Sequence, residues 1–383
     1  MNLSTVTNIL VSVTLTTAAF AQGGSPIDYR FLQLQEALHG AMDKVAPGTV
    51  TVQTFGGTRK VDGPKWKPIP TAKPGEKPKR RPGPLGMRGF KQSQGATTGI
   101  VLSPDGWILV SKFALSYDPT TILITLADGR SFNAVRKGED VSRQIALVKI
   151  EATGLPVPEF LPPAEVKVGQ WAFVMGRTFS AEDPSVHMGV VSATRRIFGR
   201  AIQIDAYTSP ANYGGPVVDI EGRVMGIAVP MDASGRKANI GLYDSGVGFA
   251  ATIADIGDLV KRMKQGEVLH RGFLGVVTDP AFLGPGARLT AVNKSSVAYR
   301  AKIRKGHVVT QIDGAQIANS FHLQMLVGKK MAGDPVHLRV RNKAGEEFGT
   351  TVFLEKVSTA QMEAKEPEDL PPPWEKKDGE GKK

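Results

Sequence analysis

The chain has 383 residues, of which 41% are hydrophobic, and it carries 48 Lys and Arg against 36 Asp and Glu. A chain of this length and composition can form two or three domains with hydrophobic cores, so it is not disordered as a whole. It contains no cysteine, which excludes disulfides and thiolate metal sites.

The amino-terminal segment resembles an export signal. Residues 9–21 are uncharged and largely apolar, and Ala19-Phe20-Ala21 gives the small-x-small pattern that precedes signal-peptidase cleavage. The apolar run is shorter than the ~18 residues that a membrane-spanning helix needs. We therefore predict a signal peptide over residues 1–21 and export to the periplasm or cell envelope. A retained membrane anchor is the alternative.

The next segment predicts one helix followed by a β-rich domain. Apolar residues recur at helical spacing at Phe31, Leu34, Leu38, Met42 and Val45, and Pro47-Gly48 ends the helix before the strand-like residues 49–55. Short β-type runs separated by Gly, Pro and Asp then continue to Ala251. About six strands in each half favour a pair of small β-barrels. A helix over residues 252–265 closes this domain, which we bound at residues 28–265.

A basic, proline-rich insertion interrupts the domain over residues 56–95. Between Arg59 and Lys91 there are eleven Lys or Arg, two acidic residues and seven prolines, a composition that cannot form a core. We predict an extended loop that adheres to an anionic polymer or lipid surface; a spacer that binds nothing is equally consistent. Nucleic acid is disfavoured because the protein is predicted to be exported, and because Trp66 and Phe90 alone offer stacking surfaces. A surface-adhesion protein is thus one functional class to consider.

Three sequence blocks in the β-rich domain resemble the signature blocks of HtrA-type trypsin-like serine proteases. They are TGIVLSPDGWILVSKF (98–113), LADGRSFNAVRKGEDVSRQIALVKI (126–150) and QIDAYTSPANYGGPVVDIEGRVMGI (203–227). The resemblance implies a mainly β fold, a trypsin-like double six-stranded β-barrel followed by one PDZ domain of the α+β class. In that family the three blocks hold the catalytic histidine, aspartate and serine. Those positions fall here on Phe113, Gln144 and Tyr213.

These three residues lack the chemistry of a Ser-His-Asp triad. The serine of such a triad needs an imidazole that takes its proton, and the imidazole needs a carboxylate that orients it. Phe113 cannot accept a proton, Gln144 carries no charge, and the phenol of Tyr213 has an ordinary pKa of about 10. The glycine that precedes the family serine by two residues is Ala211, whose side chain disfavours the oxyanion-hole turn. We predict no intact catalytic residues and a chain that is not an enzyme, with the rings of Phe113 and Tyr213 stacked in the former cleft. The alternative is an active HtrA-like serine endopeptidase of envelope protein quality control with a relocated triad.

The carboxyl-terminal part, residues 270–356, is similar to an HtrA-type PDZ domain. It begins with RGFLGV, continues through AYRAKIRKGHVVTQIDGAQI and ends with VHLRVRN and FGTTVFL. The resemblance implies a peptide carboxylate held on the loop Leu274-Gly275-Val276. It also implies a helix from Ser320 to about Met331 as the other groove wall, formed by His322, Leu323, Leu326 and Val327. Lys302 and Lys305-Gly306-His307 depart from the usual family residues. Residues 357–383, with Pro371-Pro372-Pro373, are predicted to be a disordered tail.

The expected partners follow from these assignments. They are peptides or unfolded envelope proteins bound by the PDZ domain, for a chaperone, scaffold or regulator that forms a homo-oligomer or a hetero-oligomer with an active relative. The sequence predicts no cofactor and no metal.

Overall fold

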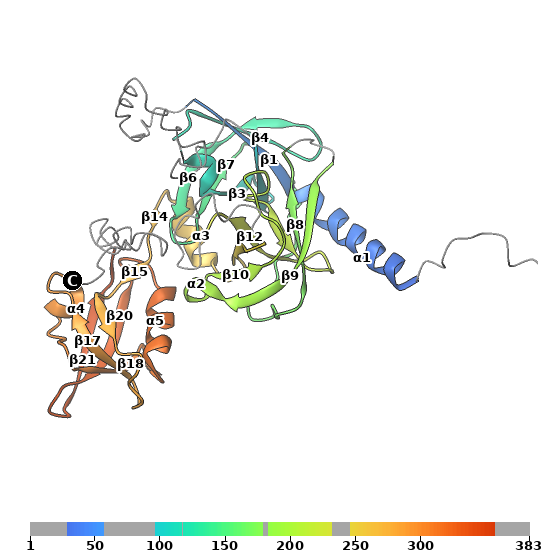
Figure 1. Cartoon of the computed structure of the whole chain (residues 1–383). Helices are drawn as coiled ribbons and strands as arrows, with labels where there is room; N and C mark the ends of the chain where they lie inside the picture. The colour runs from blue at the N-terminus through green and yellow to red at the C-terminus, as the bar shows by residue number, and fades with distance from the viewer. Residues whose placement is uncertain (1–28, 57–95, 117, 179–182, 232–245, 357–383) are drawn as a thin grey trace, which may run out of the picture.

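The computed structural model describes residues 29–56, 96–116, 118–178, 183–231 and 246–356 (Figure 1). The predicted signal peptide (1–21), nearly all of the basic insertion (56–95) and the predicted tail (357–383) lie outside the described residues and stay predictions. Within the described ranges, no helix is both long and apolar enough to cross a membrane.

The predicted first helix and strand are confirmed. Helix α1 (Tyr29–Val45) is followed by the 3-10 turn η1 (Ala46–Gly48) and strand β1 (Thr49–Phe55). The hydroxyl of Thr49 donates to the Val45 carbonyl at 3.1 Å, which satisfies one of the last helix carbonyls. The buried residues of α1, Ala41 and Val45, lie in its carboxyl-terminal half, and the helix projects from the domain (Figure 1).

The first half of the β-rich domain is one continuous sheet. Its strands are β1, β2 (Thr97–Ser103), β3 (Trp107–Ser111), β4 (Thr121–Thr125), β5 (Ser131–Asn133), β6 (Val135–Asp140) and β7 (Ile145–Lys149), with the 3-10 turn η3 (Lys112–Leu115) after β3. Strand β14 (Val268–Leu269) joins in parallel, giving the order β14-β6-β7-β3-β2-β1-β4-β5. Because the end strands β14 and β5 do not pair with each other, this half is an eight-stranded sheet and not the closed six-stranded barrel that was predicted. Ala134 alone separates β5 from β6.

The second half closes into a six-stranded barrel. Its strands are β8 (Trp171–Gly176), β9 (Ser185–Arg195), β10 (Ala201–Ile204), β11 (Pro216–Val218), β12 (Val224–Val229) and β13 (Gly248–Ala251), in the order β10-β13-β12-β11-β8-β9. The short turn α2 (Arg196–Gly199) joins β9 to β10. Helix α3 (Gly257–Lys264) begins later than predicted, because the Thr252 N–H and hydroxyl both donate to the Arg200 carbonyl and hold the preceding chain extended.

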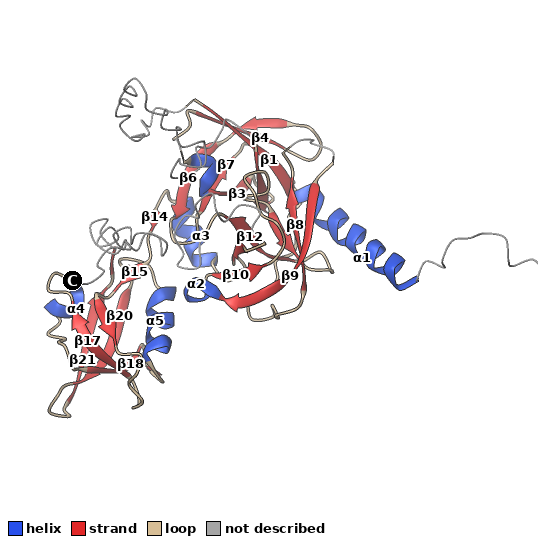
Figure 2. Cartoon of the chain, viewed as in Figure 1, coloured by secondary structure: helices blue, strands red, loops and turns tan. Residues whose placement is uncertain are grey.

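The carboxyl-terminal unit is a sheet covered by one helix (Figure 2). Its elements are β15 (Gly272–Phe273), β16 (Val276–Thr278), β17 (Ala287–Val292), α4 (Val297–Arg300), β18 (Val308–Ile312), β19 (Ala315–Gln316), α5 (Ser320–Lys329), β20 (Pro335–Arg341), β21 (Glu347–Phe353) and β22 (Glu355–Lys356). Strand β16 lies at one end of the order β16-β17-β18-β20-β21, so one of its edges is unpaired among the described strands. A separate buried cluster, which includes Leu274, Leu323 and Val340, gives this unit its own core.

A buried contact joins the carboxyl-terminal unit to the barrel. The guanidinium of Arg200, 1% exposed, donates to the Lys330 carbonyl at 3.0 Å, just past the end of α5. Its Nε and Nη1 have no partner among the described residues. Burial lowers the pKa of Arg200 from its ordinary value, and the neighbouring Arg143 acts in the same direction. The linker between the two units is also fixed, because β14 pairs with β6.

Helix α3 packs on β6 at a position where only glycine fits. A Cβ atom at Gly138 would lie 2.4 Å from the Met263 Cα and 2.5 Å from the Met263 carbonyl oxygen. We expect Gly138→Ala to lower the free energy of unfolding by about 1–3 kcal/mol, because backbone atoms of α3 must move. Urea unfolding measures this loss. The control is Gly40→Ala on α1, where a Cβ meets nothing within 4 Å; it should raise stability by up to ~1 kcal/mol. Equal stabilities of the two variants would contradict the close packing.

Candidate functional site

Phe113 lies at the end of β3, in the turn η3. The Ser111 side chain accepts a hydrogen bond from the Phe113 N–H at 3.2 Å and so caps this turn. Ser111 is fully buried and the Phe113 side chain is 1% exposed. The residue at this position is therefore held rigidly, with its ring inside the domain.

Tyr213 lies in a loop that is fixed by backbone and amide hydrogen bonds. The Tyr213 N–H donates to the Ser209 carbonyl at 3.1 Å, and the Asn212 side chain accepts from the Ser209 N–H at 2.8 Å. The Ala211 carbonyl accepts from the Thr98 hydroxyl at 2.9 Å. These bonds define the geometry of the loop without any contribution from catalytic chemistry.

The two glycines that follow Tyr213 are required by close backbone approach. Gly214 has φ +89°, and a Cβ there would lie 2.0 Å from the Thr98 carbonyl oxygen. A Cβ at Gly215 would lie 2.0 Å from the Met175 carbonyl oxygen. Both glycines let this loop pack against the two halves of the domain, which is a structural reason for their presence.

The rings of Phe113 and Tyr213 meet as predicted. Their centroids are 5.4 Å apart and their planes are inclined by 66°, an edge-to-face arrangement. Tyr213 is 2% exposed. The expected contact is confirmed; the idea that it blocks a former catalytic cleft stays a prediction.

Gln144 is joined by a backbone hydrogen bond to the turn that carries Phe113. It adopts a left-handed conformation with φ 57°. Its side-chain amide donates to the Val141 carbonyl at 2.8 Å, and its own carbonyl accepts from the Lys112 N–H at 2.8 Å. The sequence analysis did not single out Asp140, which precedes Gln144 by four residues. Its carboxylate is fully buried and forms a 2.9 Å ion pair with Arg143.

A charged network borders the turn that carries Phe113. The Lys112 ammonium lies 2.5 Å from one Glu139 carboxylate oxygen, and Arg136 lies 2.7 Å from the other. Burial alone would raise the pKa of Glu139, but Lys112 and Arg136 outweigh it and hold that pKa below its ordinary value. The carboxylate is thus ionised and engaged in ion pairs.

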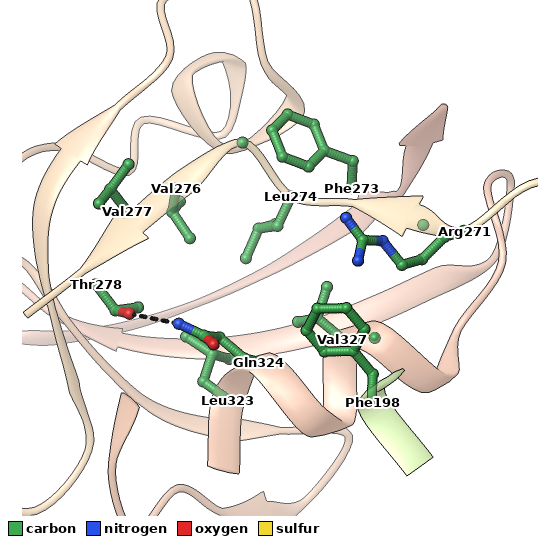
Figure 3. Close-up of a pocket in the computed structure, with 13 residues that line it drawn as sticks. Phe198, Arg271, Phe273, Leu274, Val276, Val277, Thr278, Leu323, Gln324 and Val327 are labelled. Carbon is green, nitrogen blue, oxygen red and sulfur yellow. Dashed lines mark hydrogen bonds between the residues drawn. The ribbon is translucent and has the colours of Figure 1, made fainter. Parts of the chain in front are cut away.

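A second candidate site is the groove between β16 and α5 in the carboxyl-terminal unit (Figure 3). Its volume is about 300 Å³, and its lining includes the predicted Leu274, Gly275, Val276 and Leu323. Gly275 has φ +81°, and a Cβ there would lie 2.1 Å from the Ser296 Cβ. The Gly275 carbonyl accepts from the Asn293 N–H at 2.9 Å, whereas no acceptor among the described residues binds its own N–H.

Two residues predicted to face the peptide lie outside this groove. Leu326 packs against the core of the unit, and the His322 ring accepts from the Ala318 N–H at 3.3 Å. The predicted Leu323 and Val327 do line the groove, together with Gln324, which the sequence did not indicate. The sequence identified the helix correctly, but its 3.6-residue period puts positions 323, 324 and 327 on the groove face and turns 322 and 326 away.

The barrel contributes a wall that the sequence did not indicate. Phe198 lines the groove from α2, and the Arg271 guanidinium stacks on its ring with 4.5 Å to the centroid (Figure 3). Arg195, Ile197 and Phe198 all have left-handed backbones, with φ between 53° and 60°. A Cβ at Gly328 would lie 2.4 Å from the Phe198 Cβ, so this glycine allows α2 to pack directly on α5.

Comparison with known proteins identifies the β-rich domain. Residues 97–227 match the family model described as a trypsin-like peptidase domain. The protein named "Probable periplasmic serine endoprotease DegP-like" from Halomonas elongata is 29% identical over 289 residues, and its namesake from Hahella chejuensis is 30% identical over 291 residues. The chain contains a trypsin-like peptidase domain and is homologous to DegP-like serine endoproteases. Each alignment covers 71% of this chain but 59% of the relative, so the chain spans less than two thirds of the length of these relatives.

Solved structures agree with the trypsin-like fold. The structure of "HtrA-type protease AlgW with decapeptide" has a TM-score of 0.60 and 21% identity, covering 84% of this chain and 99% of that chain. The serine endoprotease from Yersinia pestis has a TM-score of 0.57 and 20% identity, covering 84% of this chain and 98% of that one. The predicted fold class is confirmed.

These relatives overturn one prediction from the sequence. The chain was expected not to be an enzyme, because residues 113, 144 and 213 of the trypsin-like domain carry none of the triad side chains. Its relatives are named as serine endoproteases, and nothing in the described structure demonstrates a loss of activity. The identities of three side chains were an insufficient basis for denying activity to the whole domain.

The contact between Phe113 and Tyr213 can be measured by a double-mutant cycle. We expect Phe113→Leu and Tyr213→Leu each to lower the free energy of unfolding by about 1–3 kcal/mol. The double variant should lose about 0.5–1.5 kcal/mol less than the sum, because each single change already removes the ring contact. Urea unfolding of all four proteins gives the coupling. As a control, Phe113→Leu combined with Phe348→Leu in the other unit should be additive. Additivity in the first cycle would refute a stabilising ring contact.

Proposed function

We propose that this chain is an exported HtrA-type protein of envelope protein quality control that captures exposed polypeptide in its β16–α5 groove. The proposal has an enzymatic part, which is that the chain is an active serine endopeptidase. The observation that carries it is the apolar groove beside β16, whose outer edge pairs with no other described strand. At one end of the groove the Gly275 N–H has no acceptor among the residues that the structure describes.

The groove suits an extended peptide for physical reasons. A peptide laid beside an unpaired strand forms main-chain hydrogen bonds with it, and pockets along the groove hold its side chains. Leu274, Val276 and Val327 offer an apolar lining, whereas the Arg271 guanidinium has no ion-pair partner among the described residues. A carboxylate at the peptide terminus would compensate this charge. We therefore assign residues 270–356 as a peptide-binding PDZ domain.

The names of the relatives support the location and the class of activity. They are named probable periplasmic serine endoproteases, which agrees with the signal peptide predicted over residues 1–21. Unfolded envelope proteins are the partners that this location and groove suggest, and we expect a homo-oligomer. Adhesion through residues 59–91 stays a prediction, because those residues lie outside the described structure.

Peptide hydrolysis in this chain requires a nucleophile and a base that the structure does not place at the family positions. The side chain of Phe113 takes no part in proton transfer, so a hydroxyl activated elsewhere in the trypsin-like domain must act. A fluorophosphonate probe together with casein turnover decides the matter. A serine whose substitution abolishes both labelling and turnover would identify the nucleophile, whereas no labelling and no turnover would contradict the endopeptidase proposal.

Peptide capture is tested by placing a charge in the groove. We expect Val327→Glu to weaken binding of a fluorescent peptide that ends in Ala-Val-Leu by at least tenfold, because the carboxylate would be desolvated beside an apolar ligand. Fluorescence anisotropy with the full chain measures this change. The matched control is Phe353→Glu, at an apolar residue of the same unit that is 63% exposed and outside the groove. Equal binding by both variants would contradict the assignment of the groove.

A further inference from the structure

The end of the groove at Thr278 is crossed by a side-chain bridge. The Gln324 amide, on α5, donates to the Thr278 hydroxyl, on β16, at 3.1 Å (Figure 3). Both residues line the groove. The bridge joins the two walls between which a peptide would lie.

A second hydrogen bond closes the same end one residue further along. The Ser320 hydroxyl donates to the Asp279 carbonyl at 2.7 Å, and Ser320 is 8% exposed. This carbonyl directly follows β16 and is engaged by α5 of the same unit. The amino-terminal half of α5 therefore forms hydrogen bonds with two successive residues, Thr278 and Asp279, at the end of β16.

The rise per residue of a β-strand gives the number of peptide residues that fit between Gly275 and the two hydrogen bonds. A strand advances about 3.3 Å per residue, and β16 extends only from Val276 to Thr278. A peptide with its carboxylate at Gly275 has its last two residues beside Val276 and Val277. Its third residue from the end reaches Thr278 and the bridge.

We propose that the bridge between Gln324 and Thr278 sets the length of peptide that the groove accepts. This inference rests on the proposed peptide-binding function. The groove takes the two or three terminal residues of an apolar carboxyl terminus, and a longer strand beside β16 forms only when the bridge opens. Gln324 and Thr278 are thus specificity-determining residues, and the preferred ligand is a short terminal segment rather than a long added strand.

Nested peptides test the proposal with the full chain. The probes are fluorescent peptides of two, three, five and seven residues with a common carboxyl terminus, Val-Leu in the shortest and Ala-Val-Leu in the others, and anisotropy gives the affinity of each. For the wild-type protein we expect affinity to change less than twofold between three and seven residues. For Gln324→Ala and for Thr278→Val it should rise about fivefold over that range, because the longer peptide no longer competes with an internal hydrogen bond.

The control and the contrary results separate this inference from the proposed function. Gln316→Ala, at an exposed glutamine of β19 outside the groove, should behave as the wild-type protein. A steady gain of affinity with length in the wild-type protein, or bridge variants that match it, would overturn the length limit while leaving peptide capture intact. Failure of every peptide to bind the wild-type protein and both bridge variants would instead overturn the proposed function, and this inference with it.

Discussion

The trypsin-like domain depends on the close backbone packing of the loop from Ser209 to Gly215. The Gly214 N–H donates to the Ala228 carbonyl at 2.8 Å, and the Thr98 N–H donates to the Tyr213 carbonyl at 3.2 Å. The loop thereby bonds to both halves of the domain at neighbouring residues. Because there is no room for a Cβ at Gly214, this contact constrains the backbone independently of the side chain at position 213.

This constraint separates the architecture of the loop from its chemistry. The loop keeps its position through backbone bonds and two glycines, so the domain accommodates an aromatic residue at 213, where the ring packs edge-to-face on Phe113. Relatives named as serine endoproteases support peptidase activity, and the chemistry of the three family positions requires that any nucleophile be identified by experiment.

The carboxyl-terminal groove is bounded by both units of the chain. Phe198 reaches it from the barrel through a turn of left-handed residues, each of which costs about 1–2 kcal/mol for a non-glycine side chain. Packing of Phe198 on Gly328 and the hydrogen bond from Arg200 to the end of α5 favour this conformation. A peptide bound there, as we propose, would lie close to the barrel, because Phe198 lines the groove.

The sequence by itself determined the fold class and the order of its units. Short β-type runs, the three signature blocks and the Leu274-Gly275-Val276 loop were sufficient, because these signals are local and each extends over several residues. The meeting of Phe113 with Tyr213 followed once the blocks were aligned to a known fold. The sequence also placed Leu323 and Val327 on the groove wall. It did not choose Gln324 over His322 and Leu326, since a shift of one residue on a helix rotates a side chain by about 100°.

Tertiary structure alone decided the walls of the groove. Phe198 lies 73 positions before Arg271 in the sequence, and no local pattern links a left-handed turn in one unit to a glycine in another. The bridge from Gln324 to Thr278 likewise depends on the distance between a helix and a strand that are far apart in the chain. Contacts of this kind arise from the packing of completed elements, so they become visible only when those elements are placed in space.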